Sequence, residues 1–169
     1  MNIRETYDYL VRTRRDLWGT LETVPDEILS RALLSGSRFH CIKDLLFHIA
    51  DVEDGWINGD IRNNQMVQNA IPVLRNSEGG PAYADFALET LRDYWRLVEQ
   101  NTLAYLAALN DEDLTRVVHV EDWPEKRFTV DGLLWHVMIH EMRHTAQIAM
   151  LLRTQDIKPP SLDLLFYLP

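Results

Sequence analysis

The chain has 169 residues, enough to bury a hydrophobic core, and we expect one domain spanning residues 1–169. Its formal net charge of −9 disfavours nucleic acid and anionic membrane as partners, because both are bound through Lys and Arg. The single cysteine excludes an intrachain disulfide, and the sequence shows neither a signal peptide nor a membrane-spanning apolar run, so we expect a cytoplasmic protein.

Two helices are predicted in the first third of the chain. Apolar residues at steps of three and four predict a helix over about residues 3–21, with Arg14 as the one polar residue in the series. A second helix is predicted over about residues 40–59, and its Trp56 is interpreted as a core residue. Cys41 stands among apolar residues at its start, which is typical of a small core residue rather than a nucleophile.

A long, polar connection follows over about residues 60–81, with some potential for a short extra helix and with a turn at Ser77-Glu78-Gly79-Gly80-Pro81. A third helix is predicted over about residues 82–109, and a connector then leads to the last helix. No strand pattern bounded by hairpin turns is convincing anywhere in the sequence.

The fourth helix is predicted from Thr129, a plausible N-cap, to about Arg153. Pro159-Pro160 ends regular structure, and the apolar tail over residues 162–169 is expected to pack back on the helices. The predicted fold class is therefore all-α: a four-helix bundle with a long connection between helices two and three and an extended C-terminal tail.

The fourth helix is apolar almost all round, and its polar exceptions form one stripe: His136, His140, His144 and Gln147. A buried imidazole must be neutral and hydrogen-bonded or must bind a metal. His136 and His144 are about 12 Å apart along the helix axis and cannot share an ion, whereas His140 and His144 are about 6 Å apart. The stripe therefore predicts a divalent-metal site with His140 and His144 as ligands.

A third ligand must come from another helix, and His48 is the natural donor because helix two carries it in a similar apolar setting. Three histidines would leave an open coordination position for water or substrate. We expect His136 and Gln147 to line this site or to hydrogen-bond near it.

The segment His140–His144 also spells the H-E-x-x-H signature of zinc proteases, in which Glu141 would act as general base. Such enzymes need a further His or Glu ligand downstream, but no His follows His144 and no Glu follows Glu141. The sequence therefore argues against a protease, and Glu141 is expected to lie on the surface or close to the ligands.

Two stretches resemble motifs of the DinB superfamily: Leu45-Leu46-Phe47-His48-Ile49-Ala50-Asp51 in helix two, and residues 134–148 in the last helix. The resemblance implies a four-helix bundle, often a homodimer, that binds a divalent metal such as Zn or Ni through positions matching His48, His140 and His144. Similar proteins include bacillithiol S-transferases and mycothiol-dependent maleylpyruvate isomerases, which implies a small-molecule substrate and possible use of a low-molecular-weight thiol.

The sequence departs from the usual His-Glu-x-His-His-Arg-Gly-Gln form of that motif at Arg143, Thr145 and Ala146, which leaves the ligands unchanged. It does not decide whether the protein is an enzyme. One interpretation is a metal-dependent thiol S-transferase or hydrolase. The alternatives are a non-catalytic, stress-related bundle that uses a metal or an interaction surface, and a metal-free structural bundle.

Overall fold

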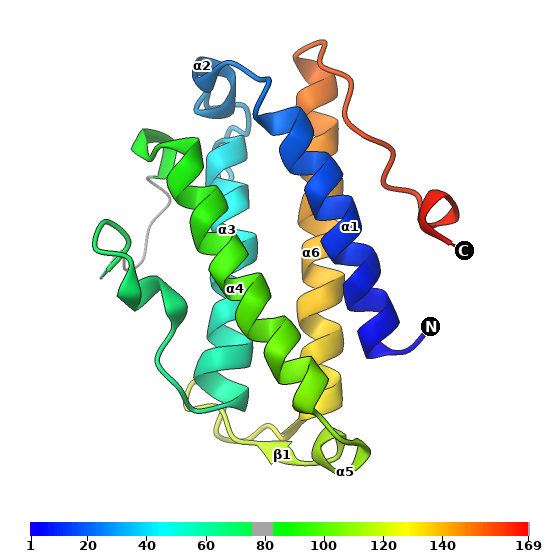
Figure 1. The fold of residues 1–169 in the computed structure, drawn as a ribbon. Coiled ribbons are helices and arrows are strands. Elements are labelled where there is room, and N and C mark those ends of the chain that lie inside the picture. The colour runs from blue at the N-terminus through cyan, green and yellow to red at the C-terminus, as the bar shows by residue number, and fades with distance from the viewer. Residues whose placement is uncertain (76–82, 169) are drawn as a thin grey trace.

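In the computed structural model, which describes residues 1–75 and 83–168, four long helices pack side by side (Figure 1). They are α1 (Ile3–Leu21), α3 (Ile42–Asp54), α4 (Leu88–Ala108) and α6 (Val130–Thr154). Shorter elements join them: α2 (Asp26–Leu29), π-helical η1 (Gly55–Ile61), the 3₁₀ turns η2 (Val67–Ala70) and η3 (Tyr83–Asp85), α5 (Asp111–Leu114), strands β1 (Val117–Val118) and β2 (Phe128–Thr129), and η4 (Leu164–Tyr167). The predicted four-helix bundle is confirmed.

The order of the helices in space is not that of a simple up-and-down bundle. Helices α3 and α4 run in the same direction, and α1 and α6 run in the other (Figure 1). Helix α3 packs against α4 and α6, and α1 closes the ring by packing against the same two helices. Because α3 and α4 are parallel, the chain must return along the bundle between them, which accounts for the long connection. The turn predicted over residues 77–81 lies outside the described residues.

Local signals set most helix ends. Helix α1 has the predicted span and begins with a capping box formed by Asn2 and Glu5. The predicted N-cap of α6 is confirmed, because the Thr129 hydroxyl accepts a hydrogen bond from the Gly132 N–H.

Helix α4 begins at Leu88 rather than at about residue 82, a position that lies outside the described residues. The preceding turn is held against α3 by a hydrogen bond of 3.2 Å from the Tyr83 N–H to Asp44 Oδ1. The Tyr83 ring also stacks on Phe47, with 3.8 Å between centroids. These contacts with α3 hold the turn in place ahead of α4.

A small antiparallel strand pair, not predicted from the sequence, precedes α6. Val117 pairs with Thr129 and Val118 with Phe128. Two residues per strand are too few to produce a recognisable alternation. The pair ties the connector to the start of α6.

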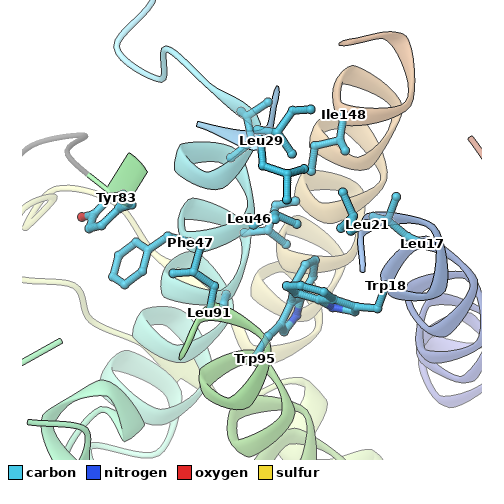
Figure 2. Close-up of a cluster of buried hydrophobic side chains, with 14 of the residues drawn as sticks. Leu17, Trp18, Leu21, Leu29, Leu46, Phe47, Tyr83, Leu91, Trp95 and Ile148 are labelled. Atoms are coloured by element: carbon cyan, nitrogen blue, oxygen red, sulfur yellow. The ribbon is translucent and has the colours of Figure 1, made fainter. Parts of the chain in front are cut away.

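Two apolar clusters fill the bundle, and a polar layer separates them. Figure 2 shows the first cluster, which draws side chains from all four long helices, among them Leu17, Leu46, Trp95 and Ile148. The second cluster lies nearer the start of α6 and includes Leu10, Ile57 and Met138. Along α1, α3 and α6 the residues between the clusters are the buried polar ones: Arg14, Glu53, Asp54, His140, Glu141 and His144. The candidate functional residues thus lie at mid-height in the bundle.

The C-terminal tail packs against α1, as predicted. The Tyr9 hydroxyl donates to the Leu162 carbonyl at 2.5 Å, and the Tyr9 and Tyr167 rings meet edge to face. Among the described residues, no helix combines the length and the apolar character that crossing a bilayer requires.

Candidate metal centre

Three of the histidines singled out in the sequence lie together between α3 and α6. His48 comes from α3, and His140 and His144 come from successive turns of α6. One ring nitrogen of each lies within 4.8 Å of the other two. The ring centroids are 4.4 Å apart for His140 and His144, 4.7 Å for His48 and His140, and 4.9 Å for His48 and His144. The antiparallel packing of α3 and α6 thus brings His48 to the His140–His144 pair.

The spacing of the nitrogens fits a small divalent cation. His48 Nε2 and His140 Nε2 are 3.0 Å apart. Zinc–nitrogen bonds of about 2.0–2.1 Å in tetrahedral geometry place two ligand nitrogens about 3.4 Å apart. Only small side-chain movements would bring all three nitrogens to that spacing, and imidazole donors suit several divalent transition metals.

The three imidazoles are neutral at pH 7. Burial, together with the other ionisable groups nearby, lowers the pKa of His48 to about 4 and that of His140 to about 3. Burial also lowers the pKa of His144. Neutral rings keep the nitrogen lone pairs that metal coordination requires.

Hydrogen bonds fix which nitrogen of His144 carries its proton. Nδ1–H donates to Gln147 Oε1 at 2.6 Å, and Nε2 accepts a hydrogen bond of 3.2 Å from Arg143 Nη2. Nε2 therefore carries the lone pair, and a cation could bind it only once the Arg143 guanidinium gives up this hydrogen bond. Gln147 therefore hydrogen-bonds to one of the three histidines.

Phe39 holds the ring of His48 in place. The two rings stack with 4.0 Å between centroids, and the edge of Phe39 faces His144 at 6.4 Å. The sequence analysis did not identify this residue, because a single aromatic residue ahead of a helix carries no specific signal.

His136 lies one turn before the three histidines and does not join them. Its side chain is exposed, with the ring centroid 5.9 Å from that of His140 and 5.5 Å from that of Trp56. Trp56, expected in the core, is only half-buried and packs against the rings of Trp123 and Phe128.

The whole chain, residues 1–169, matches the DinB family. The protein belongs to the DinB family. No curated protein matches the sequence.

Several solved structures share the fold of this DinB protein. A conserved protein from Enterococcus faecalis superposes with a TM-score of 0.73 at 15% identity, over 90% of this chain and 96% of the other. A DinB-like protein from Bacillus cereus gives 0.66 at 17% identity, over 94% of each chain. YfiT from Bacillus subtilis, described as a probable metal-dependent hydrolase with an unusual four-helix bundle topology, gives 0.65 at 15% identity, over 92% and 89%. At these identities the likeness concerns the fold.

In this DinB protein Glu141 does not lie on the surface, so the surface alternative for this residue was wrong. The residue is 3% exposed, and its carboxylate forms a bidentate ion pair with Arg14. Arg14 Nε donates to Oε1 at 3.0 Å, and Arg14 Nη2 donates to Oε2 at 2.7 Å. One residue along a helix is a rotation of about 100°, so this carboxylate leaves α6 on a different face from His140. The Glu of the H-E-x-x-H segment is therefore paired with Arg14 in the interior of the bundle.

The same guanidinium binds two further carboxylates. Its Nη1 donates to Glu99 Oε2 at 2.8 Å and its Nη2 to Glu53 Oε2 at 3.2 Å, and Glu53 also accepts from the Tyr7 hydroxyl. We call Arg14, Glu53, Glu99, Glu141 and Tyr7 the Arg14 network. It connects α1, α3, α4 and α6 through one buried cation.

Burial and charge act in opposite directions on this network. Burial by itself lowers the pKa of Arg14, but the carboxylates, Glu141 foremost, outweigh it and raise that pKa well above its ordinary value. Burial raises the pKa of Glu141, against the attraction of Arg14. The sequence signal for the network was the polar Arg14 in an otherwise apolar helix face, but a pattern in one helix does not identify a partner in another.

Proposed function

We propose that this DinB protein is a metal-dependent enzyme that holds a divalent cation, zinc or nickel, on His48, His140 and His144. The observation that supports this most directly is the meeting of three neutral imidazoles from two helices. A cation bound there would keep its full charge and would supply Lewis acidity, lowering the pKa of a water or thiol that it binds. Gln147 and Phe39 would orient the ligand rings, through the His144 Nδ1–H and by stacking on His48.

The donor set favours an enzyme over a structural metal site. Among residues 1–75 and 83–168, the group of side chains able to ligate a common ion at this place contains the three histidines and no Cys, Asp or Glu. Structural zinc sites are closed by four protein ligands, whereas catalytic sites use three and leave a position for substrate. A non-catalytic role is the weaker alternative for this reason.

We infer hydrolysis or thiol transfer on a small molecule as the reaction class. The hydrolase assignment draws support from the description of YfiT as a probable metal-dependent hydrolase, and the thiol-dependent assignment from the motif resemblance. Arg143 is exposed beside the site, with Nη2 at 3.2 Å from His144 Nε2. A guanidinium at this position favours an anionic substrate or a thiolate.

Metal content tests the ligand set. Protein purified without chelator and reloaded with zinc or nickel is expected to bind about one ion per chain, and His48→Ala and His144→Ala are each expected to lose most of it. His136→Ala is the matched control and should retain the metal, because that ring lies outside the group. Full metal content in His48→Ala would contradict the proposed site.

Turnover tests the enzymatic part separately. The metal-loaded and the chelator-treated protein are compared on a panel of esters and amides, and on electrophiles with bacillithiol-like thiols. Metal-dependent turnover of one class assigns the reaction. Metal binding without turnover across both panels would favour the non-catalytic alternative.

We also infer a homodimer that uses the outer face of α6. Apolar side chains follow one another there at steps of four, three, four and four residues: Trp135, Ile139, Met142, Ala146 and Met150. Ile139, Ala146 and Met150 are exposed, and the other two are half-buried. Ile139 is 58% exposed and Met150 is 64% exposed, which is unusual in the middle of a helix that faces solvent. The molar mass in solution checks this: a monomer at micromolar concentration would contradict it.

A further inference from the structure

An open pocket of about 460 Å³ lies between η1, the segment that leads into α6, and the first turns of α6. Its walls are largely aromatic, and six residues define what we call the aromatic pocket: Trp56, Trp123, Lys126, Arg127, Phe128 and His136. The strand pair β1–β2 positions it, because Phe128 belongs to β2 and the segment between the strands carries Trp123.

The aromatic side chains are arranged to contact a flat ring. Trp56 and Trp123 are nearly parallel, with 7° between their planes and 5.8 Å between their centroids. Phe128 stands edge-on to both, at 6.1 Å from each. Trp123 is 39% exposed, so much of its ring is left without a protein partner. An aromatic ligand entering the pocket would find indole surface on which to stack.

The charged residues of the pocket are all basic. Lys126 and Arg127 line it, and no Asp or Glu does. Both side chains are exposed, and neither forms an ion pair with any residue of the described ranges. Lys126 Nζ lies 5.4 Å from the centroid of the Trp123 ring, so a cation and an exposed indole occupy the same end of the pocket. In a chain of net charge −9, two cations without ion-pair partners in the described ranges, beside aromatic walls, favour a planar anion.

The pocket reaches the candidate metal centre through His136. That ring lines the pocket and lies 5.9 Å from the ring of His140. We propose that the aromatic pocket binds an aromatic carboxylate as part of the substrate, with the carboxylate on Lys126 and Arg127 and the ring against Trp123. That the bound carboxylate is part of a substrate rests on the proposed function, but its binding to the pocket requires no metal.

Binding to metal-free protein tests the pocket alone. The probe is naphthoate, measured by calorimetry on chelator-treated protein so that its carboxylate has no cation to coordinate. Two matched compounds separate the two contributions: cyclohexanecarboxylate lacks the flat ring, and naphthalenemethanol lacks the charge. We expect saturable binding of naphthoate and binding about tenfold weaker for each matched compound.

Variants locate the binding. Trp123→Ala is expected to weaken naphthoate about tenfold, and the double variant Lys126→Ala/Arg127→Ala about threefold or more. Phe166→Ala and Lys158→Ala, which replace an exposed aromatic residue and an exposed lysine outside the pocket, should leave the affinity unchanged. The charge variants replace exposed side chains, so they remain informative if Trp123→Ala folds poorly.

Two results would overturn the inference: naphthoate binding no better than cyclohexanecarboxylate, or equal affinity in Trp123→Ala and Phe166→Ala. If either occurs while His48→Ala still loses its metal, the aromatic pocket is refuted and the metal centre is not. If naphthoate binds as expected but the protein binds no metal, the metal centre is refuted and the aromatic pocket is not.

Discussion

Replacing Arg14 with Met removes the one cation of the Arg14 network and keeps most of the side-chain volume. The variant leaves three carboxylates facing one another, with side chains of Glu53, Glu141 and Glu99 that are 1%, 4% and 16% exposed. Breaking a buried ion pair by removing one partner costs about 3–5 kcal/mol, because the remaining charge is uncompensated. For a chain of this size that corresponds to a fall in melting temperature of about 10 °C.

Glu141→Gln is expected to cost less, about 1–2 kcal/mol. Arg14 keeps Glu53 and Glu99 in this variant, so no charge is left unpaired and the loss is that of a charge-assisted hydrogen bond. If Glu141 were instead the general base of a protease site, its replacement would abolish activity and leave stability nearly unchanged. The ranking of the two variants therefore distinguishes a structural from a catalytic role.

The assay is urea unfolding of chelator-treated protein followed by circular dichroism, with Arg15→Met as control. Arg15 is the next residue of α1, is exposed and forms no ion pair within the described ranges, so its replacement should change the free energy of unfolding by no more than about 0.5 kcal/mol. Burial raises the pKa of Glu141, and without Arg14 no cation opposes that effect. Protonation then favours the folded state, so the deficit of Arg14→Met should shrink as the pH falls below about 7. Equal stability of Arg14→Met and Arg15→Met would refute the reasoning.

Two further measurements test the site environment. The pKa of His48 falls from 6.5 to about 4 on folding. Between those pH values the unfolded chain binds a proton on His48 that the folded chain does not, so the metal-free protein should lose stability as the pH falls through this window. His48→Leu should lose less stability over the same window. Superimposable profiles of unfolding free energy against pH for the two proteins, measured in urea, would count against this. Burial raises the pKa of Cys41 to about 11, so iodoacetamide should label it only after unfolding in guanidinium, which mass spectrometry detects; rapid labelling of the folded protein would show the thiol to be accessible.

The helices were predictable because their signals are local. Apolar spacing gave the span of α1 and a cap residue gave the start of α6, and both depend on residues within one or two turns. The start of α4 was not predictable, since the turn at Tyr83 is held by contacts with Asp44 and Phe47 about 40 residues earlier in the chain.

In the candidate site, too, features set within one helix were predictable and features set by packing between helices were not. The spacing of His140 and His144 on one helix indicated a ligand pair, and a second motif pointed to His48. The stacking of Phe39 and the pairing of Glu141 with Arg14 depend on how helices distant in sequence face each other. One step of about 100° along the helix separates Glu141 from the ligand face, but the sequence of α6 could not show that Arg14 of α1 covers the face on which Glu141 lies.

The long separation between the members of the Arg14 network affects how the chain reaches its fold during synthesis. Glu141 follows Arg14 by 127 residues, and the last helix of the bundle is also the last to be made. At about 5–20 residues per second, α1 waits on the order of ten seconds on the ribosome before its partner emerges. Glu53 and Glu99 can pair with Arg14 before α6 emerges, but the apolar faces that α6 covers stay open until then. A product truncated before α6 would present those faces to chaperones or proteases.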